Sequence, residues 1–222
     1  MSAILPPIPS ASNFTADPSA TLRGFTLADL AQYTPEKVAG PAASKDVMMY
    51  LVGKDDVHDI FKYLLSRASV SIIFNMYGFD DDELNQIAMA KILDPNVYVQ
   101  ITLDESQAGG RHEKALLDAD RAQDLKAFQS HVAIGQSATH SISHTKAGVL
   151  DGLATFVGST NWSRDGEGTF ILKGQPGGPG YKAQNNTLDV ILDREIAARF
   201  TARLNDEHNT AQKQMAARAA AS

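Results

Sequence analysis

Four polar side chains of types that can act on a phosphate ester lie in one stretch, residues 143–163. They are His144, Lys146, Ser159 and Asn161. Apolar and β-branched runs flank Asp151-Gly152 within this stretch, and Asp-Gly between two such runs predicts a β-hairpin with a two-residue turn. In that register His144 and Lys146 share one face of a strand, and Ser159 lies opposite His144.

The predicted hairpin places an imidazole, an ammonium, a hydroxyl and a carboxamide on one surface. Its register also sets Leu150 opposite Leu153 and Lys146 opposite Val157. An imidazole can act as nucleophile or base, and the other groups can hold the oxygens of a tetrahedral phosphate. An exposed polar sheet face beside a loop would show the same pattern, so the residues alone leave both interpretations open.

The spacing of these residues resembles a known signature. His144-x-Lys146, four residues, Asp151, six residues and then Gly158-Ser159-Thr160-Asn161 is similar to the HKD motif of the phospholipase D superfamily. Residues 71–80 resemble the early strand of that family, and Val97–Asp104 resembles its strand that ends in Asp. The likeness covers about residues 46–205.

Only one copy of the motif is present, as in the small family members that resemble Nuc-type endonucleases and mitochondrial cardiolipin-hydrolase-like proteins. The resemblance implies a homodimer with one active site on its two-fold axis. It implies that His144 attacks phosphorus to form a phosphohistidine, and that His144 of the partner subunit protonates the leaving oxygen. Lys146 and Asn161 would hold the non-bridging oxygens and Ser159 would hydrogen-bond within the site, with no metal or cofactor.

The sequence departs from the family pattern downstream of the motif. Members commonly carry Asn-x-Glu there, with a carboxylate that orients the histidine, but residues 184–189 read QNNTLD. Gln184, Asn186 or Glu167 could take this role, and the sequence leaves the choice open. Asp151, the "D" of the motif, falls in the predicted turn, which favours a structural role for it and for Gly158.

Alternating strand and helix patterns surround the motif and predict an α/β protein. The resemblance specifies a mixed β-sheet flanked by helices, the phospholipase D-like fold. Apolar runs predict strands over Val47–Val52, Ala68–Met76 and Val97–Leu103. Helical periodicity predicts helices over Leu27–Tyr33, Asp56–Arg67, Glu83–Leu93, Ala115–Gln129 and Glu195–Ala221.

Composition divides the chain into three parts and excludes several functional classes. We expect a Pro/Ser/Ala-rich arm over residues 1–45, a phosphodiesterase domain over 46–210 and an Ala-rich tail over 211–222. The 222 residues include no cysteine, which excludes a disulfide scaffold, a cysteine zinc site and a thiol nucleophile. No apolar run is long enough for a transmembrane helix and no secretory signal is recognisable, so we expect a cytoplasmic protein.

Charge bears on the substrate. Lys plus Arg is 20 and Asp plus Glu is 26, so the net charge of −6 does not indicate a basic nucleic-acid groove. Nucleic acid is nonetheless the expected substrate because the small one-copy members resemble nucleases. A phospholipid is the alternative, through hydrolysis or phosphatidyl transfer, and a binding protein with an inactive site is the third.

A few residues around the motif are secondary candidates. Arg164, Lys173, Lys182 and Asn186 could meet further phosphates, and the Gly-rich residues 174–180 between them form either a flap or a plain connection.

Several other side chains fit ordinary structural roles. His140 and His144 are too far apart on a strand to share an ion. We expect His112 in a solvated loop or at a helix start, Trp162 in the core, and Asp80, Asp81 and Asp82 as helix caps rather than as a metal site.

Overall fold

A computed structural model describes residues 24–34, 45–107, 109–122, 131–139, 142–169, 174 and 177–221. Much of the predicted N-terminal arm lies outside the described residues, as do His140 and Lys173.

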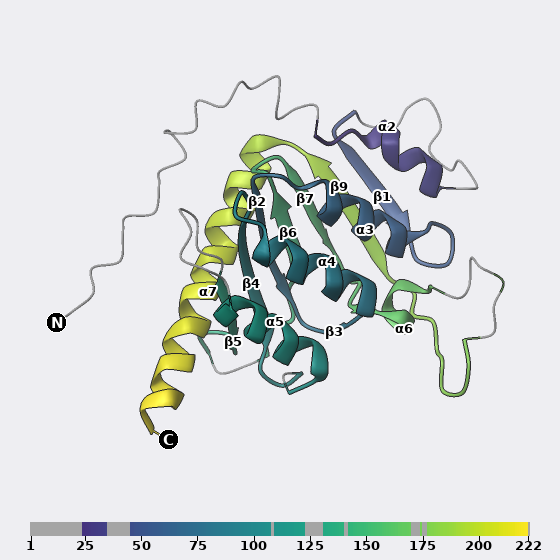
Figure 1. Ribbon diagram of the computed structural model, residues 1–222. Coiled ribbons are helices and arrows are strands. Elements are labelled where there is room, and N and C mark those ends of the chain that lie inside the picture. Colours follow the sequence, from purple (N-terminus) through teal and green to yellow (C-terminus); the bar gives the residue numbers. More distant parts are fainter. Residues whose placement is uncertain are drawn as a thin grey trace.

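The described chain is built on one seven-stranded mixed sheet, which confirms the predicted fold class (Figure 1). The strand order is β1-β9-β7-β6-β2-β4-β5. β2, β4 and β5 run parallel, and the remaining neighbours pair antiparallel. The bounds are β1 Val47–Leu51, β2 Ser71–Met76, β4 Tyr98–Asp104, β5 His131–Gly135, β6 Lys146–Leu150, β7 Ala154–Gly158 and β9 Thr187–Leu192. A separate two-stranded ribbon joins β3 (Phe79–Asp80) to β8 (Trp162–Ser163).

Helices cover both faces of the sheet (Figure 1). The helices are α2 Leu27–Leu30, the 3₁₀ turn η2 Ala31–Tyr33, α3 Val57–Arg67, α4 Asp82–Leu93, α5 Arg111–Ala122, α6 Arg164–Glu167 and α7 Arg194–Ala221. The main core joins α3, α4 and α5 to one face, with Trp162 fully buried among Phe61, Phe74 and Phe156, as predicted for this tryptophan. α7 lies on the other face, on a smaller apolar cluster around Ile73 and Val149.

The predicted elements are present, and the structure adds others. The helix predicted over Ala115–Gln129 begins at Arg111, and residues 123–130 lie outside the described residues. Strands β5 and β9, the short β3–β8 ribbon and α6 were not predicted. The helix predicted over Glu195–Ala221 is confirmed as α7, in which Ala211 packs against Gly135.

The register predicted for the hairpin is wrong by one residue. Leu150 pairs with Ala154 rather than Leu153, and Ala147 pairs with Val157. The turn therefore holds three residues, with Asp151 and Gly152 both at positive φ (52° and 61°). The reason lies outside the hairpin, because the Asp151 N–H donates to Ser71 O (2.9 Å) and extends the β2–β6 ladder into the turn.

The Asp151 carboxylate fixes this end of the sheet. It is buried and accepts the backbone N–H groups of Ser69 (3.0 Å), Val70 (2.8 Å) and Ser71 (2.9 Å), together with the Ser69 hydroxyl. Its position in the turn is as predicted. These bonds join the α3–β2 loop to the turn at the end of β6 opposite Lys146, so the carboxylate ties two neighbouring strands together.

We expect Asp151→Ala to lower the free energy of unfolding by about 3 kcal/mol, because it leaves three backbone N–H groups without their charged acceptor. Asp151→Asn keeps an acceptor oxygen and tolerates positive φ, and we expect a loss of about 1 kcal/mol. Urea unfolding followed by circular dichroism measures both values. Asp118→Asn, on the exposed surface of α5, is the control. Equal stability of Asp151→Ala and the wild type would contradict this role.

Candidate active site

The predicted catalytic residues gather where β2 and β4 end and β6 begins. Carboxyl ends of parallel strands are the usual place for a ligand site in an α/β sheet. Tyr77, the first residue after β2, lies at the centre. Its ring contacts the His144 imidazole edge-on, with centroids 4.5 Å apart, and Lys146 Nζ lies 4.9 Å from the ring centroid. The structure thus brings His144 and Lys146 together on one aromatic ring.

Two carboxylates hold the residues on either side of His144. Asp104, the last residue of β4, accepts the Ser143 N–H (2.5 Å). Glu207 on α7 accepts the Thr145 hydroxyl (3.1 Å) and the Asn75 amide (2.6 Å). The segment that carries the imidazole is therefore held by side chains from β4 and α7.

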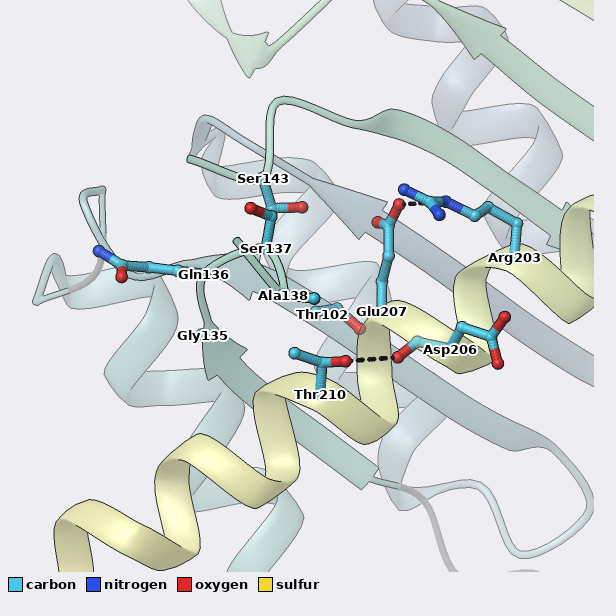
Figure 2. Close-up of a pocket in the computed structure, with 10 residues that line it drawn as sticks. All are labelled: Thr102, Gly135, Gln136, Ser137, Ala138, Ser143, Arg203, Asp206, Glu207 and Thr210. Atoms are coloured by element: carbon cyan, nitrogen blue, oxygen red, sulfur yellow. Dashed lines mark hydrogen bonds and ion pairs between the residues drawn. The ribbon is translucent and has the colours of Figure 1, made fainter. Parts of the chain in front are cut away.

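Glu207 lines a polar hollow under α7 (Figure 2). Ser143 and Thr102 line it from the sheet side, and Glu207 points into it from α7 beside Arg203, with which it forms an ion pair (2.8 Å). His144 is not among its lining residues. The hollow thus lies beside the segment that carries His144 and not at the imidazole itself.

Asn161 contacts the residue that follows Tyr77. Its Oδ1 accepts the Gly78 N–H (3.2 Å), and this bond does not use its NH₂ group. A Cβ atom at residue 78 would lie 3.1 Å from Asn161 Cγ, so glycine permits this approach. The β3–β8 ribbon pairs Phe79 with Trp162 immediately beyond and holds the two loops in register. His144, Lys146 and Asn161 therefore flank one turn, Tyr77-Gly78.

Ser159 does not lie opposite His144, because the hairpin register differs by one residue. Its hydroxyl donates to Asn186 Oδ1 (3.1 Å) and accepts the Thr187 N–H (3.0 Å). A Cβ at Gly158 would lie 2.2 Å from Thr187 O, so glycine allows β7 to approach β9 closely. Ser159, Gly158 and Asn186 thus fix the β7–β9 junction behind Asn161.

Burial controls the charge of Lys146. The residue is only 6% exposed, and its Nζ donates to the His144 carbonyl oxygen (3.0 Å). Burial lowers the pKa of Lys146 to about 8, and the charge of Asp104 opposes this shift. The ammonium form that would bind phosphate is therefore present at neutral pH and depends partly on Asp104.

A cleft of about 390 Å³ opens beside the Tyr77-Gly78 turn. Its lining includes Asn161, Gln107, Asp80, His112 and Glu113, and no Lys or Arg is among its described residues. His112 begins α5 as expected but is 3% exposed rather than solvated, with ring nitrogens facing Asp80 (3.1 Å) and Asp82 (2.7 Å).

The remaining candidates lie outside this cleft. Arg164 is exposed and faces Asp165 (3.3 Å), and Lys182 is exposed on the segment that returns beside α6. Glu167 is fully buried against His58, so it is not the carboxylate that orients His144. Burial raises the pKa of Glu167 to about 7. Asp81 caps α4 through the Leu84 N–H (2.8 Å), as predicted for the acidic cluster.

Sequence reasoning missed Tyr77 and Glu207. Tyr77 immediately follows a predicted strand, in the stretch 71–80 that resembles the early strand of the family, which was a usable signal. Glu207 lies 62 residues from Thr145, on a helix with many charged residues. Nothing in its local sequence distinguishes it from the other acidic residues of that helix.

Comparison with known proteins places the chain in a family. The profile of the family described as "Cardiolipin synthase, PLD-like domain" matches residues 61–207, more than half of the chain. The chain therefore belongs to the phospholipase D superfamily, whose members are phosphodiesterase-type enzymes. No curated protein sequence matches it. No helix within the described residues is both long and apolar enough to span a bilayer.

Two solved structures are similar in fold. Nuc, a phospholipase D family member from Salmonella typhimurium, is 15% identical with a TM-score of 0.52, and the match covers 74% of this chain and 96% of Nuc. NucT from Helicobacter pylori is 15% identical with a TM-score of 0.53, and the match covers 74% of this chain and 98% of NucT.

The environment of Lys146 predicts the pH dependence of phosphodiester hydrolysis. Because burial lowers the pKa of Lys146 to about 8, we expect the rate to fall as pH rises through about 8. Asp104→Asn removes the charge that raises this pKa, and we expect the alkaline limb to move about 1 pH unit lower. The rate of hydrolysis of bis(p-nitrophenyl) phosphate measures this limb.

The matched control is Glu105→Gln, which changes the neighbouring carboxylate that pairs with Arg218 on α7. This variant should keep the wild-type limb. If the alkaline limb of the pH–rate profile is unchanged in Asp104→Asn, Asp104 does not stabilise the charged form of Lys146.

Proposed function

We propose that this protein is a metal-independent phosphodiesterase that acts through a phosphohistidine, and that it is an endonuclease. The observation that carries the proposal is the convergence of His144, Lys146 and Asn161 on the Tyr77-Gly78 turn. These three groups supply a nucleophile, a cation and an amide donor around one position, which is the set that a phosphoryl group requires.

The reaction proceeds in two displacements. One imidazole nitrogen of His144 attacks phosphorus and forms a P–N bond as the P–O bond to the leaving group breaks. His144 of the partner subunit gives its proton to the leaving oxygen and then takes a proton from water. That water attacks phosphorus and breaks the P–N bond, which restores both imidazoles. Lys146 and Asn161 hold the non-bridging oxygens in both steps.

A homodimer follows from this scheme, because one chain supplies a single HKD motif and the reaction needs two imidazoles. A two-fold interface would bring the same residues together from both subunits. Ile142, two residues before His144, is a large apolar side chain that is 50% exposed, which suits a contact beside the site.

Similarity in fold supports the nuclease. The match extends over 96% of Nuc and 98% of NucT. The net charge of −6 means that nucleic acid must be bound by local cations, and the exposed Arg164 and Lys182, with Lys173 between them in sequence, provide them. The cytoplasm suits such an enzyme.

A second candidate is hydrolysis or transfer of a phospholipid headgroup. The observation that favours it is the cleft beside Asn161, whose described lining has Asp80 and Glu113 but no cation. A polynucleotide would bring further phosphates into this cleft, whereas a headgroup with an ammonium ion would match it.

Cleavage of plasmid and single-stranded DNA in excess EDTA tests the proposal. We expect the wild type to cleave, because the scheme uses no metal ion. We expect His144→Ala to be inactive, with loss of at least ~1,000-fold in rate, because it removes both nucleophile and acid. His131→Gln, a change at a histidine on β5, is the control and should remain active.

Other outcomes discriminate between the candidates. DNA cleavage by His144→Ala at the wild-type rate would contradict the assignment of His144 as the nucleophile. Absence of DNA cleavage together with His144-dependent release of choline from phosphatidylcholine vesicles would favour the phospholipid candidate. Inactivity on DNA, vesicles and bis(p-nitrophenyl) phosphate would contradict phosphodiesterase activity altogether.

Mixing wild type with His144→Ala tests the shared site. If each site needs both imidazoles, only wild-type homodimers are active, and an equal mixture after subunit exchange should keep about a quarter of the activity. Independent sites would instead give about half of the activity. Subunit exchange is verified with differently sized tags, and a mixture of wild type with His131→Gln should keep full activity.

A further inference from the structure

Three side chains from different elements meet in one cluster. His58 comes from α3, Asp81 caps α4, and Glu167 ends α6. One ligand atom from each lies within 4.8 Å of the others. His58 Nδ1 faces both carboxylates, in contact with Glu167 Oε2 and 3.5 Å from Asp81 Oδ2. The three donors therefore surround one point.

We propose that His58, Asp81 and Glu167 bind a divalent transition-metal ion of the zinc type. One imidazole nitrogen and two carboxylate oxygens form a donor set that zinc accepts, with water in the remaining position. This site is separate from the HKD residues, and its ion would have a structural role.

Charge balance supports a cation here. The Glu167 side chain has no exposed surface, and its Oε1 is buried without a hydrogen-bond partner among the described residues. Asp81 uses Oδ1 to cap α4 and directs Oδ2 to the cluster. A divalent ion beside a neutral His58 would offset the charge of both carboxylates in their ionised form.

The far side of the imidazole supports the same assignment. His58 Nε2 faces Glu83 Oε2 (3.7 Å), and Lys62 holds Glu83 through an ion pair (2.5 Å). A histidine that binds metal through one nitrogen usually directs its other N–H to a carboxylate, which orients the ring. Because Lys62 neutralises Glu83, that carboxylate does not compete for the ion.

The position of the cluster gives the ion a function. Asp81 follows Gly78 by three residues, and Glu167 follows Asn161 by six. The β3–β8 ribbon joins these two loops at Phe79 and Trp162, and the cluster joins them again where the ribbon ends. A bound ion would thus hold together the two loops that carry Gly78 and Asn161, which are hydrogen-bonded to each other in the candidate site.

Binding of Zn²⁺ to the untagged full-length chain, stripped with EDTA, tests this proposal. We expect one Zn²⁺ per chain by titration calorimetry and elemental analysis, and a Tm several degrees higher with zinc. We expect His58→Gln and Glu167→Gln to lose both effects. Asp81→Asn retains a capping oxygen for α4 but loses the ligand charge, so it should fold and bind zinc at least ~10-fold more weakly.

The matched control is His112→Gln. His112 is another buried histidine between two carboxylates, but Asp80 and Asp82 face its opposite ring nitrogens and cannot share one ion with it. This variant should bind zinc as the wild type does. Absence of zinc binding to the wild type, or undiminished binding to Asp81→Asn and His58→Gln, would overturn the proposal. Neither readout depends on phosphodiester hydrolysis, so failure here leaves the proposed function intact.

Discussion

Burial of the Lys146 ammonium group is the constraint on which the active site depends. An ammonium ion that is 6% exposed has lost most of its hydration and must be stabilised by protein groups. The His144 carbonyl, the Tyr77 ring and the charge of Asp104 supply this stabilisation. They belong to three chain segments, so the lysine fixes the ends of β2 and β4 and the segment before β6 relative to one another. The stabilisation is incomplete, since the pKa of Lys146 is lowered, and a bound phosphate would supply the missing negative charge.

The aspartate of the HKD motif contributes to the same arrangement from a distance. Asp151 lies at the opposite end of β6 from Lys146 and accepts three consecutive N–H groups at the start of β2. These bonds set the register of β6 against β2. A slip of one residue would turn Lys146 to the α7 face of the sheet, away from Tyr77. Asp151 therefore acts on the position of Lys146 through the strand that joins the two residues.

The sequence predicted those parts of the molecule that depend on local pattern. The mixed sheet, its main helices and the hairpin with Asp151 in its turn all follow from apolar runs, periodicity and the motif. Strand β5 was missed because its five residues, HVAIG, include a glycine and a histidine. The hairpin register was wrong because a contact with Ser71, 80 residues away, sets it.

The same distinction applies to the site. His144, Lys146 and Asn161 could be selected from spacing, whereas their supports come from far along the chain. Asp104 holds Ser143 across 39 residues and Glu207 holds Thr145 across 62. A carboxylate on a strand end or a helix is common, and only the fold shows which group it binds. Local sequence therefore identifies the candidate reactive groups more easily than it identifies the groups that position them.

Charge around the site separates the two substrate classes more sharply than the chemistry at phosphorus does. A single phosphodiester needs only His144, Lys146 and Asn161, and these groups serve a nucleotide or a lipid equally. A polynucleotide also brings phosphates on both sides of the scissile bond, and one side of the site is the cleft lined by Asp80 and Glu113. Phosphates in that cleft would meet two carboxylates and no described Lys or Arg, so a polynucleotide requires cations elsewhere on the surface, whereas a single headgroup does not.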